Sequence, residues 1–298
     1  GEHPDLRFSI DANDLALLHS GARGQLRASG HFRGDARDPL LVTRIRGSAI
    51  DFEGMQLQSI SGDIDFEPQG NGRADINLQL EQFASGTRRF SHLGVTTAGT
   101  TAAHRYEVDL HATPYHIQAS GQGQYTDGVW RAGIETFTAG DGSALHMALV
   151  QPATLVASVT GDPLQLGNFC LQDAQATFCA ELSREVGRTQ ASVHAANVPL
   201  RMLTTGLGSE TDFDGRVSLD AQAEANGDAA WTGSVNGTLA DAAVRHHLSG
   251  GRIESFNLGT GNVRARLDAD GLDASVGLVA GASGNIAGHL QARNEGGE

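Results

Sequence analysis

The segment RVSLDAQAEA, residues 216–225, has apolar or small side chains at its odd-numbered positions and polar side chains at its even-numbered positions. A period of two is typical of a β-strand with one apolar and one hydrated face. The same pattern recurs in RADINLQLE (73–81), HRYEVDLH (104–111) and NVRARLDA (262–269). We therefore predict one long sheet of short amphipathic strands with a continuous apolar surface.

Composition also favours an all-β fold. The 39 glycines in 298 residues suit a chain that reverses direction often and do not suit long helices. Only 39% of the residues are hydrophobic, so the sequence predicts no membrane span. The formal charge of −14 argues against nucleic acid as a partner, because binding to phosphates requires a basic surface.

Two segments interrupt the alternation, DANDLALLHSG and AANVPLRMLTTG. Each has an asparagine, then a cluster of leucines, then a terminal glycine, which predicts short helices at about 14–20 and 199–205. A strand-like run follows each segment, so the two together indicate an internal repeat. We predict a first repeat unit over 1–195 and the start of a second over 196–298, continuous with the first in one elongated structure.

The chain has two cysteines, Cys170 and Cys179, with eight residues between them. This spacing fits neither a zinc knuckle nor a redox-active CxxC pair. A disulfide is feasible if the two residues lie on neighbouring strands of a hairpin, and it would indicate an oxidising compartment. The alternative is two buried thiols that act as small hydrophobic side chains.

The sequence predicts that the protein is not an enzyme and needs no cofactor. It contains no GxSxG elbow, no P-loop and no HExxH motif. The glycine-rich segments GQGQYTDG (121–128) and GTGNVRA (259–265) lack the spacing of a phosphate-binding loop, and we assign both to hairpin turns. LDADGLDA (267–274) lacks the spacing of a calcium loop, and we assign it to a turn as well.

The twelve histidines raise the question of a metal site, and His104, His111 and His116 form the densest group. On a strand, His111 and His116 have opposite parity and would point to opposite sides. His246 and His247 would also point apart. We therefore predict surface roles for the histidines and no metal site.

Five features follow one another between residues 24 and 179: GQLRASGHFRGDARDP (24–39), GTTAAH (99–104), Trp130, Pro152 and the segment with the two cysteines. In this order they resemble the TamB family, which belongs with the AsmA-like bridge proteins. The resemblance implies a U-shaped β-taco, an open groove with an apolar concave face and a hydrated convex face.

The resemblance also implies a cellular role. Members of the family are anchored in the inner membrane of Gram-negative bacteria and extend through the periplasm. They are implicated in phospholipid transport between the inner and outer membranes, in outer-membrane biogenesis and in protein secretion through the translocation and assembly module. The chain would be an interior periplasmic segment whose partners are phospholipid acyl chains and, through a carboxy-terminal part that it lacks, a TamA-like outer-membrane barrel.

If the apolar parity of the strands forms the floor of a groove, that parity supplies the lipid-binding residues. The predicted floor consists of Ile50, Phe52, Ile64, Phe66, Ile76, Leu78, Leu80, Val108, Leu110, Val193, Val217, Leu219, Val263, Leu267, Val276 and Leu278. The core of a closed sandwich or barrel would show the same alternation, so this alternative stays open.

A different function would also suit an open sheet. The protein would then be a scaffold or chaperone that holds unfolded outer-membrane proteins or autotransporters by β-strand pairing during TamA-dependent assembly.

Overall fold

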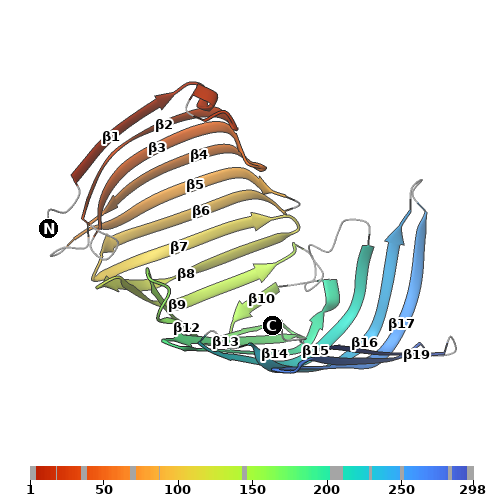
Figure 1. The fold of residues 1–298 in the computed structure, drawn as a ribbon. Coiled ribbons are helices and arrows are strands. Elements are labelled where there is room, and N and C mark those ends of the chain that lie inside the picture. The colour runs from red at the N-terminus through yellow and green to blue at the C-terminus, as the bar shows by residue number, and fades with distance from the viewer. Residues whose placement is uncertain are drawn as a thin grey trace. The chain divides into compact units, whose positions relative to one another are not determined.

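The chain divides into two compact units, Gly1–Pro163 (unit 1) and Leu164–Glu298 (unit 2). The computed structural model describes residues 5–17, 19–34, 39–67, 72–86, 88–142, 146–201, 211–227, 230–248, 252–280 and 284–293. The described part of both units is built almost entirely of antiparallel strands, so the predicted all-β fold is confirmed (Figure 1).

Unit 1 is an antiparallel meander in which each strand from β1 to β8 pairs with the next one along the chain, while β10 and β11 both pair with β9. Its strands are β1 (Asp5–Ala12), β2 (Ala22–Gly34), β3 (Pro39–Phe52), β4 (Met55–Phe66), β5 (Ala74–Ser85), β6 (Arg88–Thr100), β7 (Ala103–Ala112), β8 (Tyr115–Thr126), β9 (Val129–Gly140), β10 (His146–Leu149) and β11 (Ala153–Ser158).

Unit 2 continues the same strand-to-next-strand pairing from β12 to β19. Its strands are β12 (Leu164–Gln172), β13 (Thr177–Glu185), β14 (Arg188–Pro199), β15 (Thr211–Asn226), β16 (Thr232–His247), β17 (Ile253–Asp268), β18 (Gly271–Val279) and β19 (Asn285–Arg293). No helix in the described residues is long and apolar enough to cross a membrane.

Tight hairpin turns join several of the strands. Glu53 and Gly54 both have positive φ, and they connect the register partners Phe52 and Met55 in a two-residue turn. The segment LDADGLDA supplies the turn between β17 and β18, as predicted.

The assignment of GQGQYTDG to a turn is confirmed in part, because Asp127 and Gly128, both with positive φ, form the turn that connects the register partners Thr126 and Val129. The segment GTGNVRA lies within β17, so its assignment to a turn is wrong. Gly121 and Gly123 lie inside β8, and Gly259 and Gly261 lie inside β17, so these pairs are not turn residues. Because glycine has no Cβ, these positions leave room for groups on neighbouring strands, as described below for β8.

The first predicted helix is shorter than expected. It is a single 3₁₀ turn, η1 (Leu15–Leu17), held by a hydrogen bond from the Ala16 N–H to Asp14 Oδ1 at 3.0 Å. β2 then begins at Ala22, and Leu15 is buried among Ala12 and Ala22.

At the second predicted helix Leu200 and Arg201 are helical, and residues 202–205 lie outside the described residues. The predicted repeat boundary at 195/196 falls within β14, and the repeat itself stays a prediction.

Candidate functional site

The strand register in unit 1 places apolar side chains in continuous rows across the sheet. Register partners in an antiparallel pair project from the same face, so a row of partners defines one face. One row crosses nine strands, from β1 to β9, without a polar side chain: Ile10, Ala28, Ile45, Gly62, Leu78, Val95, Val108, Ala119 and Phe137.

A second apolar row runs on the same face and reaches β10. Its members are Ala12, Leu26, Gly47, Ile60, Leu80, Leu93, Leu110, Ile117, Ala139 and Met147. The row between these two projects from the opposite face and is polar or small throughout: Asp11, Arg27, Arg46, Ser61, Gln79, Gly94, Asp109, Gln118 and Thr138. Unit 1 therefore has an apolar face and a polar face.

A bulge in β3 keeps the apolar face continuous where the alternation changes parity. Ala49 has a φ of 50°, and the pairing of β3 with β2 shifts register beside it. Ile50 is even-numbered, but because of the bulge it projects from the same face as the odd-numbered Gly47. Its Cδ1 lies 2.8 Å from the point where a Cβ on Gly47 would stand. Ile50 and Phe52 pack there with Leu26.

The apolar face of unit 1 is concave at the end where β4 and β8 approach each other. Four strand spacings separate these strands, about 19 Å in a flat sheet. The rings of Phe66 on β4 and Tyr125 on β8 nevertheless meet edge to face, with their centroids 5.3 Å apart. Two side chains can meet across that span only if the sheet curves toward the face that carries them, and Figure 1 shows the strands of unit 1 bent along their length.

A pocket of about 600 Å³ lies on the first strands of this sheet. It is centred on one more row of register partners, and residues on either side of that row complete its lining. The central residues are Gly30, Thr43, Ile64, Ile76 and Thr97. The Thr43 hydroxyl is buried without a hydrogen-bond partner.

Three polar aromatic side chains, two of them buried, lie together at one end of the apolar face. Trp130 Nε1 donates a hydrogen bond to His104 Nε2 at 2.9 Å, and the Tyr106 hydroxyl donates to the Gly133 carbonyl at 3.2 Å. His104 is 6% exposed and Tyr106 is 7% exposed. Burial, and to a lesser degree the charge of Glu135, raise the pKa of Tyr106, so it stays a neutral donor.

Glycines on β8 make room for this aromatic group. A Cβ on Gly121 would lie 2.8 Å from the Tyr106 hydroxyl, and one on Gly123 would lie 2.6 Å from both His104 Nε2 and Trp130 Nε1. Sequence reasoning missed the group, although the spacing of the two glycines inside an alternating segment was a signal for it.

Ion pairs hold neighbouring strands together on the polar face. Asp63 on β4 accepts hydrogen bonds from Arg46 at 2.7 Å and from Arg44 at 2.8 Å, both on β3. Hydrogen bonds from Arg46 and then Arg44 outweigh desolvation and lower the pKa of Asp63. The same contact raises the pKa of Arg44. Cross-strand ion pairs therefore connect β3 and β4 on the polar face.

Unit 2 has the same two-faced organisation. One row of partners from β12 to β19 is apolar throughout: Phe169, Ala180, Val193, Ala221, Val235, Ala265, Ala274 and Leu290. The adjacent row projects from the other face: Cys170, Cys179, His194, Asp220, Asn236, Arg264, Ser275 and His289.

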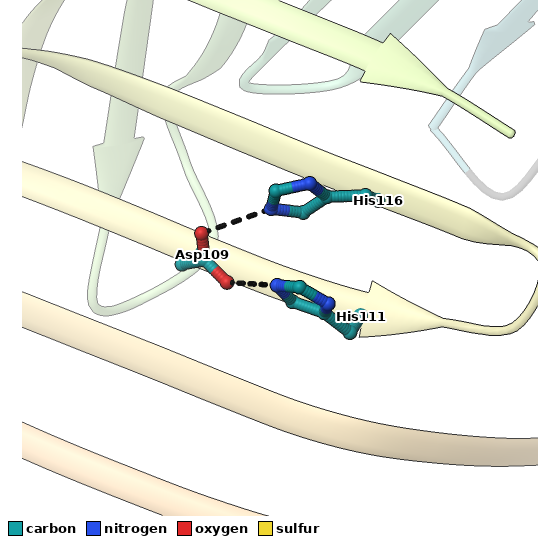
Figure 2. A group of neighbouring side chains, drawn as sticks. All are labelled: Asp109, His111 and His116. Atoms are coloured by element: carbon teal, nitrogen blue, oxygen red, sulfur yellow. Dashed lines mark hydrogen bonds and ion pairs between the residues drawn. The ribbon is translucent and has the colours of Figure 1, made fainter. Parts of the chain in front are cut away.

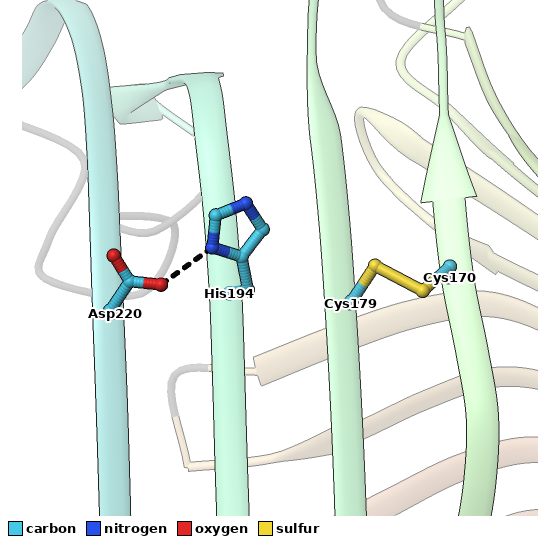
Figure 3. Close-up of a disulfide and its surroundings, with 4 residues drawn as sticks. All are labelled: Cys170, Cys179, His194 and Asp220. Carbon is cyan, nitrogen blue, oxygen red and sulfur yellow. Dashed lines mark hydrogen bonds and ion pairs between the residues drawn. A yellow bond between two sulfur atoms is a disulfide. The ribbon is translucent and has the colours of Figure 1, made fainter.

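Cys170 and Cys179 are therefore on the polar face of unit 2. They are register partners on β12 and β13, and their sulfurs form a disulfide (Figure 3). In the same row, His194 Nδ1 lies 2.6 Å from Asp220 Oδ1.

All sixteen predicted floor residues lie on the apolar face of the unit to which they belong. Those in unit 1 are Ile50, Phe52, Ile64, Phe66, Ile76, Leu78, Leu80, Val108 and Leu110. Those in unit 2 are Val193, Val217, Leu219, Val263, Leu267, Val276 and Leu278. Their contact with lipid stays a prediction.

The apolar faces are only partly buried. Leu267 is 39% exposed and Leu290 is 58% exposed. Among the described strands β1 pairs only with β2, so the sheet of unit 1 does not close into a barrel.

The prediction that His111 and His116 face opposite sides is wrong. They are register partners across the β7–β8 hairpin and lie on the same face, with ring centroids 3.9 Å apart. Parity is preserved only along one strand, and the turn between these residues resets it. Figure 2 shows both imidazoles directed at the carboxylate of Asp109, with Nε2–Oδ distances of 2.8 Å from His111 and 3.0 Å from His116.

The chain was compared with protein families, curated proteins and solved structures. The family model described as the N-terminal domain of TamB matches residues 1–297. No curated protein and no solved structure matches the chain.

Proposed function

Since the chain belongs to the TamB family, we propose that its apolar sheet faces bind phospholipid acyl chains and form part of a hydrophobic groove for lipid transport between the inner and outer membranes. The family is one of non-enzymatic transport and assembly proteins of the cell envelope and is associated with the TamA module. Transport of lipid would support outer-membrane biogenesis.

The two unbroken apolar rows of unit 1 carry this proposal. Each methylene removed from water contributes about 0.8 kcal/mol, so an acyl chain gains free energy anywhere along such a surface. The rows contain no charged residue from β1 to β9. The free energy that an acyl chain gains by binding therefore varies little from strand to strand. A lipid tail could therefore move across the strands without leaving an apolar surface, while its headgroup stays in water.

The periplasm is the compartment we propose. The disulfide between Cys170 and Cys179 supports this, because disulfides persist in the periplasm and are rare in the cytosol. The full-length protein would be anchored in the inner membrane, and a TamA-like barrel would be its partner at the outer membrane.

Two neighbouring residues on β5 provide a matched test. Leu78 lies in an apolar row, and Gln79 lies in the adjacent polar row on the opposite face. Leu78→Arg places a guanidinium on the proposed lipid path, whereas Gln79→Arg adds the same charge to a face already lined by ion pairs. We expect phospholipid to co-purify with wild type and with Gln79→Arg, and to be strongly reduced in Leu78→Arg, as measured by native mass spectrometry and lipid extraction.

Circular dichroism of the two variants serves as the folding control. Wild-type protein without bound phospholipid would contradict the proposal. Equal lipid content in two folded variants would contradict it as well, because binding would then not depend on the apolar face.

A second candidate function is strand pairing with unfolded outer-membrane proteins. Among the described residues β1 pairs only with β2, and all nine residues of β19 are exposed, so both strands offer backbone groups at an edge. If this function dominates, peptides from unfolded barrel strands will bind equally well to Leu78→Arg and Gln79→Arg, and prolines introduced into β1 or β19 will reduce that binding.

A further inference from the structure

The β7–β8 hairpin of unit 1 brings three potential metal ligands together on the polar face. Asp109 and His111 are two residues apart on β7 and project from the same side. His116 is the register partner of His111 on β8. One carboxylate and two imidazoles therefore converge although they come from two strands (Figure 2).

The distances among the ligand atoms suit a small divalent ion. The carboxylate oxygens of Asp109 lie 2.8 Å from His111 Nε2 and 3.0 Å from His116 Nε2, and one ligand atom from each residue lies within 4.8 Å of the others. In a tetrahedral zinc site with bonds of 2.0–2.2 Å, neighbouring ligand atoms are about 3.3 Å apart. To reach this spacing, the two distances from Asp109 to the imidazoles would have to lengthen by only a few tenths of an ångström.

The cluster is also accessible. The side chains of Asp109, His111 and His116 are 33%, 45% and 42% exposed, so a hydrated ion can approach and keep water in its remaining coordination positions. Imidazole nitrogen combined with a carboxylate suits late first-row divalent metals, and mixed histidine and carboxylate sets of three ligands hold zinc in many proteins.

Neighbouring polar groups would support such a site. His92 on β6 lies beside the cluster, with Nε2 3.9 Å from Asp109 Oδ1, and its Nδ1 is 2.8 Å from Glu81 on β5. Gln118 donates a hydrogen bond to Asp109 at 2.8 Å, which fixes the carboxylate. Groups of this kind orient metal ligands in known sites.

This arrangement differs from the other histidine–carboxylate contacts of the chain. His31 with Asp5 and His194 with Asp220 are pairs of one imidazole and one carboxylate. Among the described residues, only the cluster on the β7–β8 hairpin brings together three or more such donors within ligand distance. One imidazole beside one carboxylate forms only an ion pair or a hydrogen bond, whereas three ligand groups together can chelate a metal ion.

We propose that Asp109, His111 and His116 form a binding site for a divalent transition-metal ion, with Zn²⁺ as the best match to the ligands. Bound metal would link β7 to β8 on the polar face and thereby stabilise unit 1. The inference is independent of lipid binding, because it concerns the opposite face of the sheet.

Zinc titration of the metal-stripped chain, prepared without a histidine tag, tests the site. The test variant is His116→Gln, whose amide can still donate to Asp109 and so preserve the hairpin. The matched control is His194→Gln, which removes a half-exposed histidine from a carboxylate pair on unit 2. We expect saturable binding of one Zn²⁺ per chain in wild type and in the control, and affinity at least about tenfold lower in His116→Gln.

Cobalt provides a second measurement on the same proteins. Co²⁺ bound by two imidazoles and a carboxylate at low coordination number should give intense visible absorption bands that His116→Gln lacks and His194→Gln retains. Absence of saturable zinc binding in wild type would overturn the proposal. Unchanged affinity in a folded His116→Gln protein would overturn it too.

Discussion

Replacing Gly123 by alanine should destabilise unit 1, because Gly123 leaves the space that a partly buried hydrogen bond occupies. The new Cβ would stand 2.6 Å from His104 Nε2 and 2.6 Å from Trp130 Nε1. These two atoms form a hydrogen bond 2.9 Å long. His104 Nδ1 lies 3.1 Å from the Thr100 carbonyl, and the Tyr106 ring packs edge to face on Trp130, so neither ring can move freely.

The expected loss follows from three contributions. Breaking the hydrogen bond between Trp130 and His104 costs about 1 kcal/mol, and forcing a methyl group into a packed site costs about 1–3 kcal/mol. The lower backbone entropy of alanine in the unfolded chain offsets about 0.4–1 kcal/mol. The free energy of unfolding should therefore fall by about 1–3 kcal/mol.

Gly133 on β9 is the matched control. It faces open space, with no heavy atom within 4 Å of a Cβ placed there. Gly133→Ala keeps the carbonyl that accepts the Tyr106 hydroxyl and should be neutral or stabilising by up to about 1 kcal/mol.

Urea unfolding followed by Trp130 fluorescence measures both variants. A Trp231→Phe background removes the second tryptophan, which lies in unit 2 and is 47% exposed. Addition of Trp130→Phe removes the indole donor, so Gly123→Ala should cost less in that background when unfolding is followed by circular dichroism. If Gly123→Ala and Gly133→Ala differ by less than about 0.5 kcal/mol, the packing argument for this group is wrong.

Three further outcomes are expected. Cys170→Ser, which frees Cys179, should lower the free energy of unfolding by about 2–3 kcal/mol under oxidising conditions, and wild type should lose the same amount on reduction; no effect of reduction on wild type would contradict this. Hydrogen bonds from Arg46 and Arg44 lower the pKa of the Asp63 carboxyl group. The stability that the ionised carboxylate contributes is therefore present above the ordinary pKa of 3.8 and is lost as the pH falls through the lowered pKa. The stability difference between wild type and Asp63→Asn should therefore shrink between about pH 5 and pH 2 in acid titrations, and a constant difference would count against the pairing. Gly54→Val should cost more than Gly54→Asn in thermal unfolding, because φ is 80° at this turn position and asparagine tolerates that region; equal costs would argue against the turn geometry.

The faces of the sheet could be predicted from the sequence because side-chain direction in a strand is a local property. Leu78 and Gln79 differ in face whatever the register of β5 with its neighbours. Even the bulge at Ala49 left Ile50 correctly assigned, since the apolar residues themselves reveal the change of parity. The proposal that lipid follows the apolar face rests on this local pattern together with the family.

The metal-ligand cluster could not be predicted by the same rule. His111 and His116 differ by five positions, and that odd number places them on opposite faces only if a single strand contains both. A turn between Ala112 and Tyr115 makes them partners instead, because antiparallel partners have position numbers with a constant sum. The location of the turn, and not the spacing of the histidines, determines whether these side chains meet.

Interior glycines connect the composition of the chain to the curvature of its sheet. A concave face brings side chains from neighbouring strands closer together than a flat one does. On the apolar face of unit 1, a Cβ on Gly62 would lie 2.9 Å from Ile45 Cγ2 and 3.1 Å from Leu78 Cδ1, and one on Gly47 would lie 2.9 Å from Ile60 Cγ2. Larger residues at these positions would push the strands toward a flatter sheet. The glycine content therefore reflects turns and also the absence of side chains where the curved apolar face has no space for them.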